Sequence, residues 1–243
     1  MNELHPISLS YVVYKLVMKV LTNRLKPLLP QIISDTQSIF TLGRSIIDNI
    51  LVAYKVFYHM RGNASSLGSM EIKLDMSKAY DRVECDFLRR VKMKLWFQVD
   101  CISLVMKCVR TTSFSFLVNG VPKGHILHSL GLHKGDCISP YLFIFCMEGL
   151  SSLLRCKVKR GALHGIRIYR EMAFISYLLF ADGTMIFCEA TEEGISMLKK
   201  VLVKYESASC QKVKFNKTEV SFSKGVKAEK RCCIMNVWIL RRC

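Results

Sequence analysis

The run Glu-Ile-Lys-Leu-Asp-Met-Ser-Lys-Ala-Tyr-Asp-Arg-Val at residues 71–83 constrains this chain more than any other segment. Ile72 and Leu74 alternate with charged residues, which is the period-2 pattern of a β-strand. Asp75 then stands where the strand ends and a turn begins. A carboxylate in that position lies within reach of a metal ion, so the sequence predicts a strand that ends at a candidate metal ligand.

A second aspartate of this kind lies in Leu-Leu-Phe-Ala-Asp-Gly at residues 178–183. Asp-Gly is a strong hairpin signal, so we expect Asp182 at a β-turn. Taken alone, Asp75 or Asp182 is more readily explained as an ordinary strand-end or turn residue. Two carboxylates on adjacent strand ends, however, are what two-metal phosphoryl or nucleotidyl transfer requires.

Composition narrows the class of protein and of partner. With 243 residues and 51% hydrophobic content, the chain can bury a core as one or two domains. Its 36 Lys and Arg against 19 Asp and Glu give a net charge of +17, which favours a polyanionic partner such as nucleic acid. A membrane surface is the competing partner, but no amphipathic basic helix stands out.

The chain shows no sign of export. It begins without a basic, apolar leader, and its most apolar stretch, 138–150, is too short and is interrupted by Pro140. We therefore expect an intracellular protein, in the cytoplasm or nucleus, that is neither secreted nor in a membrane. The 11 cysteines are expected to be reduced, and the lack of a C-x-x-C pair argues against zinc.

The pattern of apolar residues predicts mixed helices and strands. Helices are expected over 10–28, 45–60, 85–96, 100–110, 139–157 and 192–208. Strands are expected over 72–75, 164–169, 174–180 and 185–188, in a hairpin of 113–118 with 121–127, and as a pair near 212–223. Antiparallel hairpins among helices predict an α+β fold.

The first of these helices carries apolar residues at helical spacing, which we expect to face the core. They are Val12, Val13, Leu16, Val17, Val20, Leu21 and Leu25. Pro27 and Pro30 are expected to end the helix.

Over residues 4–225 the chain resembles the reverse transcriptase domain of non-LTR (LINE-type) retrotransposons, in the plant-like branch. Residues 73–83 resemble the first catalytic motif, and Phe180-Ala181-Asp182 the second. The template-side motif is similar to Gly131-Leu132, Gly135-Asp136 and Ser139-Pro140. Further similar segments are 5–9, 23–26, 37–40, 43–44, 48–49 and 211–217.

This resemblance implies a polymerase palm with partial fingers, in which an antiparallel catalytic sheet packs on helices and the thumb is absent. Residues 1–69 would be a partial fingers segment, and 70–225 the palm with the remaining fingers elements. Residues 226–243 would be a truncated C-terminal tail, with Trp238 in an apolar end that lacks its packing partner.

The resemblance also implies an RNA-directed DNA polymerase that adds dNTPs to the 3′-hydroxyl of a DNA primer on an RNA template. Asp75, Asp182 and the Met76 carbonyl would hold two Mg²⁺ ions, with Mn²⁺ as a possible substitute. Nucleotide-binding residues would be Tyr80, Lys73 and Gly135, and Tyr80 would exclude ribonucleotides. Template and primer would contact Arg24, Arg44, Gly131, Ser139, Pro140 and Lys217.

Several positions depart from the family pattern. The second catalytic motif has Gly183 in place of a second aspartate, and Cys210 stands where glycine is common. The template-side motif carries Leu130, His133, Lys134, Cys137 and Ile138 in place of the usual residues. The alternative is therefore a catalytically inactive retrotransposon remnant that at most binds nucleic acid. A viral-type RNA polymerase or a group II intron maturase is a weaker alternative.

Overall fold

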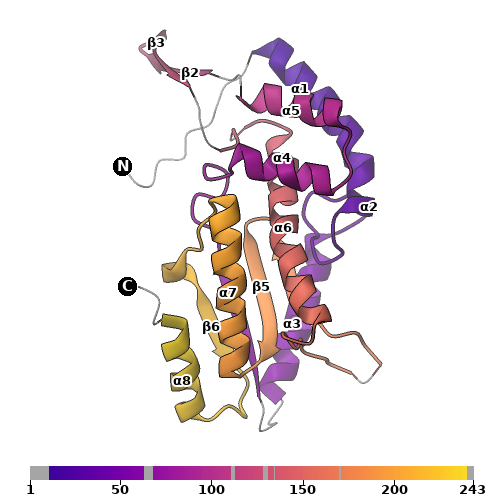
Figure 1. The fold of residues 1–243 in the computed structure, drawn as a ribbon, viewed down its shortest axis with the longest axis vertical. Helices are drawn as coiled ribbons and strands as arrows, with labels where there is room; N and C mark the ends of the chain where they lie inside the picture. The colour runs from indigo at the N-terminus through magenta and orange to yellow at the C-terminus, as the bar shows by residue number, and fades with distance from the viewer. Residues whose placement is uncertain are drawn as a thin grey trace.

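A four-stranded antiparallel sheet in the order β4-β5-β1-β6 organises the fold of the computed structural model (Figure 1). Its strands are β1 (Ser69–Asp75), β4 (Tyr177–Phe180), β5 (Gly183–Glu189) and β6 (Glu219–Phe222). The structure describes residues 11–62, 68–110, 113–127, 131–133, 135–169 and 171–239. The α+β fold with an antiparallel sheet packed on helices is therefore confirmed.

Helices cover both faces of the sheet. One face packs against α6 (Ser139–Lys159) and α7 (Glu192–Ser209), with α4 (Cys85–Lys94) lying across both helices. The other face packs against α3 (Ile46–Gly62), whose Val56 belongs to one buried cluster with Leu178 and Phe187. Met70, Ile72 and Leu74 alternate along β1, so they share one face, and all three are buried in the core cluster that contains α6 and α7.

The remaining described elements lie around this sheet. They are α1 (Val12–Leu25), a 3-10 turn (Lys26–Leu28), α2 (Leu29–Ile32), α5 (Val99–Arg110), β2 (Ser113–Val118), β3 (Val121–Leu127), a 3-10 turn (Phe215–Lys217) and α8 (Ala228–Ile239). The β2–β3 hairpin has the predicted bounds, and both turn residues, Asn119 and Gly120, have positive φ angles of 51° and 79°. This is what a tight, right-twisted hairpin needs.

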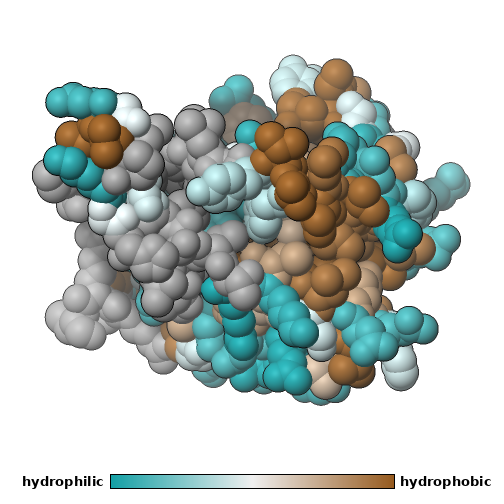
Figure 2. All heavy atoms as spheres, turned by 90° about the horizontal axis from the view of Figure 1, so that it is seen from above, coloured by the Kyte–Doolittle hydropathy of each residue, from teal (hydrophilic) through white to brown (hydrophobic). Residues whose placement is uncertain are grey.

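The prediction for the first helix was wrong for most of the residues expected to face the core, although Leu21 and Leu25 do pack against it. Val12 and Val13 are 72% and 73% exposed, whereas Met18 and Thr22 are buried. Figure 2, which views the end of the molecule where α1 lies, shows hydrophobic side chains gathered on the surface. Apolar residues occur on more than one side of this helix, so spacing alone could not say which side meets the core.

The two prolines also act differently from expectation. The α1 helix ends at Leu25, but the chain continues into the 3-10 turn and then into α2. Pro27 and Pro30 each occupy the first turn of the element that follows, where the missing N–H has no helical partner to lose.

The C-terminal segments differ most from the sequence predictions. Residues 212–223 do not pair with one another: Val213 forms an isolated bridge with Met76, and β6 pairs with β1. The predicted strand 164–169 is reduced to one bridge between Ile166 and Ile175. Trp238 does not lack a packing partner, because α8 packs on α7 and leaves Trp238 only 6% exposed.

No helix in the described parts of the chain is long and apolar enough to cross a membrane. The ten cysteines in the same ranges are all free thiols.

Lys92 breaks the apolar pattern of α4 and generates a stability prediction. It is 2% exposed, and its Nζ has no hydrogen-bond partner among the described residues. Burial lowers the pKa of Lys92 from 10.5 to about 8, although nearby thiols, Cys101 first, oppose this shift. We expect Lys92→Met, which keeps the length and removes the charge, to raise the free energy of unfolding at pH 7 by about 3 kcal/mol.

The pH dependence of this gain provides the check. Between pH 8 and 10.5 the unfolded chain binds the Lys92 proton and the folded chain does not, so the wild type regains stability as pH rises. The gain from Lys92→Met in urea denaturation should therefore shrink across that window. The variant is the necessary reference because burial also raises the pKa of Cys146 and Cys188. These two thiols make the wild type lose stability as pH rises, which opposes the effect of Lys92. A gain independent of pH, or the same gain from the exposed Lys94→Met, would contradict the explanation.

Cys210 ends α7 in a left-handed conformation, with φ 58° and ψ 4°, and its N–H donates to the Glu206 carbonyl. A side chain costs about 1 kcal/mol in this conformation, which glycine adopts freely. We expect Cys210→Gly to stabilise the fold by about 1 kcal/mol, or about 2–4 °C in Tm. Cys210→Ala should give no gain, and an equal gain from alanine would assign the effect to the thiol instead.

Candidate active site

The register of the sheet brings the two predicted aspartates to neighbouring strand ends. Asp75 is the last residue of β1 and pairs directly with Gly183, the first residue of β5. Asp182 immediately precedes Gly183 in the turn that joins β4 to β5. Both carboxylates reach solvent, since Asp182 is exposed and Asp75 half-buried. The arrangement is an open acidic pair on a rigid sheet.

The turn itself differs in one detail from the Asp-Gly hairpin that the sequence predicts. Asp182 lies in a β-turn as expected, but Phe180 pairs with Gly183, so the two central residues are Ala181 and Asp182. The left-handed residue is Ala181, with φ 53°, and not Gly183. Pairing with β1 draws Gly183 into the strand, which shifts the turn by one residue.

A polar segment before α3 holds this turn from outside the sheet. Leu179 N–H donates to the Thr36 carbonyl at 2.9 Å, and Gln37 forms a parallel bridge with Leu179. The Gln37 side-chain oxygen accepts from Ala181 N–H at 3.5 Å. The Asn49 amide donates to the carbonyls of Thr36 at 2.9 Å and Leu179 at 3.3 Å. Buried Gln37 and Asn49 therefore fix the position of the turn that carries Asp182.

Glu148 anchors the same segment from α6. Its carboxylate is buried and accepts from the Ser34 N–H at 3.1 Å and the Ser34 hydroxyl at 2.9 Å. Burial raises the pKa of Glu148, and the two Ser34 hydrogen bonds and the Arg155 charge oppose this. The sequence signal for such a role was an acidic residue inside an apolar helical stretch, but it did not identify the partner.

Arg44, predicted to contact template or primer, is committed to the chain's own backbone. Its guanidinium donates to the carbonyls of Ser34 at 2.6 Å, Gln37 at 2.9 Å, Ile33 at 3.2 Å and Pro30 at 3.3 Å, and its side chain is 17% exposed. It also pairs with Asp35 at 3.0 Å. Contact with a phosphate stays a prediction, but the side chain already stabilises the segment behind the turn.

Two lysines lie near the acidic pair. The Lys217 ammonium is 4.0 Å from the Asp75 carboxylate, and the Lys73 ammonium is 3.8 Å from Glu219, with both lysines exposed. Exposed pairs at these distances contribute little to stability, so both cations can exchange partners. Lys214 N–H donates to the Asp75 carbonyl at 2.7 Å. The neighbouring Met76 carbonyl, the predicted third metal ligand, takes no part in this hydrogen bond.

Tyr80 lies beside the acidic pair and packs on α6. Its ring stacks on Phe143 with 5.0 Å between centroids. Burial raises the pKa of Tyr80, and the charge of Asp182 raises it further. The interaction with Asp182 places the phenol near the candidate metal ligands, as expected for a residue that contacts the incoming nucleotide.

The template-side segment packs directly on the loop that carries Tyr80. Gly131 N–H donates to the Val83 carbonyl at 2.9 Å, and Leu132 N–H donates to the Tyr80 carbonyl at 2.8 Å. A Cβ on Gly131 would lie 2.8 Å from the Asp81 carbonyl oxygen, and its φ is 97°. Glycine is required here because no side chain fits between the two backbones.

The rest of this segment leads into α6. Gly135 is exposed, Ser139 is buried as the first residue of α6, and Pro140 occupies the first turn of that helix. The Tyr14 hydroxyl donates to the Asp136 carboxylate at 2.9 Å, which joins the segment to α1. Arg24 is exposed on the same helix.

The donors present fit Mg²⁺ with a shared coordination shell. The acidic pair offers only oxygen atoms, and the described residues contain no group of three or more His, Cys, Asp or Glu side chains that could hold a metal. Magnesium sites of this kind complete their shell with phosphates and water. A Cβ on Gly183 would lie 3.5 Å from the Phe180 carbonyl oxygen, which is an ordinary contact. There is therefore room for a third carboxylate beside Asp75, although the sequence has glycine at this position.

Known proteins share both the sequence and this fold. Two curated relatives are an uncharacterized mitochondrial protein of Arabidopsis thaliana, 49% identical over 69 residues, and the transposon TX1 uncharacterized 149 kDa protein of Xenopus laevis, 27% identical over 150 residues. The chain spans 57% and 11% of their respective lengths.

Solved telomerase structures from Candida tropicalis and Candida albicans share the fold. They are 12% and 13% identical to this chain, with TM-scores of 0.56 and 0.57. The match covers 89% and 88% of this chain, and 41% and 36% of theirs. The family model "Reverse transcriptase (RNA-dependent DNA polymerase)" matches residues 1–231, nearly the whole sequence, and so the chain belongs to the reverse transcriptase family.

Proposed function

We propose that this chain is the RNA-directed DNA polymerase domain of a non-LTR retrotransposon, of the plant-like branch, that acts inside the cell. The observation that carries the proposal is the pairing of Asp75 with Gly183, which brings Asp182 beside Asp75 on a rigid sheet. The substrates are an RNA template, a DNA primer and dNTPs. The net charge of +17 suits binding of such polyanions.

In this proposal each residue near the acidic pair has a distinct role. Asp75, Asp182 and the Met76 carbonyl would hold two Mg²⁺ ions, whose chemistry would be to activate the primer hydroxyl and to stabilise the leaving pyrophosphate. Tyr80 limits the space at the sugar 2′ position and so selects dNTPs. Lys217, 4.0 Å from Asp75, orients that carboxylate until substrate phosphates compete for the lysine.

The second candidate function is nucleic-acid binding without catalysis. Gly183 favours it, because the position directly opposite Asp75 carries no carboxylate. His133 in the template-side segment is buried, whereas Leu130 and Lys134 lie outside the described residues. The division into fingers (1–69), palm (70–225) and a C-terminal tail (226–243) stays a proposal, with α8 packed on the palm helix α7.

Primer extension separates the two functions. We expect the wild type to incorporate dNTPs slowly with Mg²⁺ or Mn²⁺, and Asp75→Asn to lose about 100-fold or more of that activity. Gly183→Asp should raise incorporation about 10- to 100-fold and lower the Mg²⁺ concentration for half-maximal rate, because it adds a ligand where space exists. Gly183→Asn, of equal size but neutral, is the matched control.

The opposite outcome is equally clear. If neither the wild type nor Gly183→Asp incorporates dNTPs while salt-sensitive RNA binding persists, the chain binds nucleic acid without catalysis. Incorporation that survives Asp75→Asn would remove the acidic pair from the mechanism.

The contact between Gly131 and the Tyr80 loop gives a second test. We expect Gly131→Ala to destabilise the fold by about 3 kcal/mol, from left-handed strain together with the clash with Asp81. Gly120→Ala is the matched control, because that glycine is also left-handed but has open space around it, so only about 1 kcal/mol should be lost. Equal losses in urea denaturation would show that the approach to Asp81 is not tight.

A further inference from the structure

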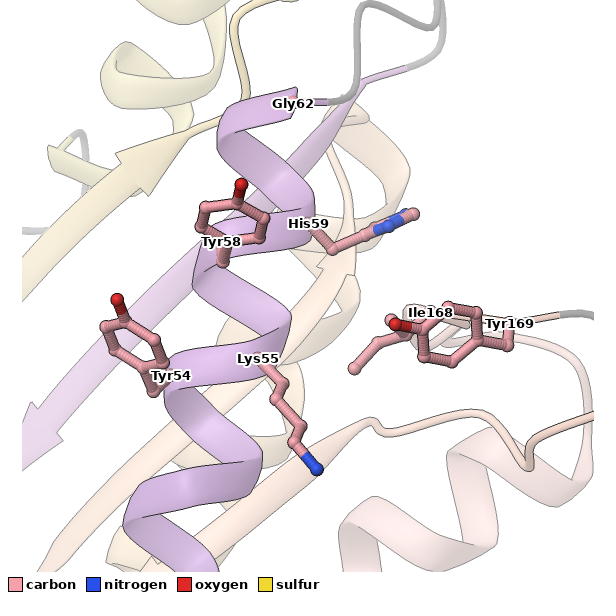
Figure 3. A pocket seen from close by; sticks show the side chains of 7 residues that line it. All are labelled: Tyr54, Lys55, Tyr58, His59, Gly62, Ile168 and Tyr169. Carbon is pink, nitrogen blue, oxygen red and sulfur yellow. The ribbon is translucent and has the colours of Figure 1, made fainter.

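A groove lined by aromatic and basic side chains runs along the outer side of α3. Tyr54, Lys55, Tyr58 and His59 line it from α3, and Ile168 and Tyr169 line it from the opposite wall. Its volume is about 440 Å³. Figure 3 shows Lys55 and His59 lying between the two α3 tyrosines and the Ile168–Tyr169 pair. The groove therefore has aromatic walls with cationic or polar side chains between them.

The three tyrosine rings face solvent. Tyr54, Tyr58 and Tyr169 are 67%, 72% and 67% exposed, and within the described ranges none has a ring partner or a side-chain hydrogen bond. In contrast, the rings of Tyr177 and Tyr205 are buried and hydrogen-bonded. Exposed rings on both walls offer flat faces to a ligand, and nothing in the core requires them.

The charge of the groove is positive. No acidic residue lines it, and Lys55 forms no ion pair among the described residues. Arg61, one helical turn after Phe57, stacks over that ring, with 4.6 Å between the guanidinium carbon and the ring centroid. Aromatic faces that alternate with cations are the combination that binds single-stranded nucleic acid, since bases stack on the rings and phosphates meet the cations.

Packing fixes this groove relative to the acidic pair. Asn49, in the first turns of α3, bonds to Leu179 beside the catalytic turn. Tyr54 to His59 follow about 8 to 15 Å further along the helix axis. Ala53 and Val56 are buried against the sheet, which turns the tyrosine side of α3 outward. A strand that leaves the acidic pair along α3 would therefore reach the groove.

We propose that this groove binds single-stranded nucleic acid, with bases stacked on Tyr54, Tyr58 and Tyr169 and phosphates on Lys55. The proposal depends on the proposed function only for the class of polymer, because its residues are separate from the acidic pair. A protein partner is the competing occupant, since Ile46, Ile47 and Ile50 are exposed earlier on α3. The Lys55 cation between the rings, with no acidic residue in the lining, favours nucleic acid.

Fluorescence anisotropy of the full chain with a labelled 12-nucleotide oligo(U) or oligo(dT) tests the proposal. Tyr54→Ala/Tyr58→Ala should weaken binding by roughly 5- to 150-fold per lost stack. The Phe pair, which keeps the rings, should bind like the wild type, and the Leu pair, which keeps only apolar surface, should lose as much as the Ala pair. Lys55→Gln should reduce the slope of log affinity against log salt by about 1.

The controls separate the groove from the acidic pair and from folding. Trp96→Ala removes an aromatic side chain that is 93% exposed elsewhere, and it should leave binding unchanged. Thermal melts should show that the tyrosine variants remain folded. A primed duplex with a one-nucleotide overhang is too short to reach the groove, so any incorporation on it should not change in these variants.

Two results would overturn the proposal. Unchanged oligonucleotide binding in the Ala pair would show that the rings do not stack on bases. Full binding by the Leu pair would show that the groove recognises apolar surface, as a protein partner would. If the chain never incorporates dNTPs but the Ala pair loses oligonucleotide binding, the polymerase proposal fails. The proposal that the groove binds single-stranded nucleic acid would still hold.

Discussion

The pairing of β1 with β5 is the interaction on which the rest of the structure depends. It places Asp75 opposite Gly183 and, through the short turn to β4, brings Asp182 to the same edge. The same pairing seats Ile72 against Ile186 in the core. A slip of one residue would turn each of these side chains to the other face, so core packing enforces the register that also forms the acidic pair.

A buried polar network supports the acidic pair from outside the sheet. Glu148 holds Ser34, and the following residues bond to β4 and to the turn through Gln37 and Asn49. Buried carboxylates and amides are costly unless they are hydrogen-bonded, and the network provides partners for Glu148 and Asn49, whereas the Gln37 Nε2 has none among the described residues. It ties the segment before α3 to the sheet and fixes the position of Asp182.

Two departures from the family pattern, Gly183 and Cys210, and the buried Lys92 differ in their physical consequences. Gly183 leaves the backbone intact and removes only a carboxylate, because the strand accepts any residue there. Lys92 places a charge in the core, and Cys210 puts a side chain in a left-handed cap. The last two lower stability, which for domains is commonly only about 5–15 kcal/mol. We therefore expect this reverse transcriptase fold to be less stable than its motifs alone indicate.

Local sequence patterns determined much of this protein: the β1 strand ending at Asp75, the Asn119-Gly120 hairpin and the α+β class. These features depend on residues within a few positions of each other, so period and turn chemistry predict them. The acidic residues could be identified individually, as could the family. Only the tertiary structure decided which side of α1 is buried, that Trp238 packs on the domain, and that Glu148 anchors Ser34. Those outcomes depend on contacts between segments far apart in the sequence, whose partners a local pattern does not specify.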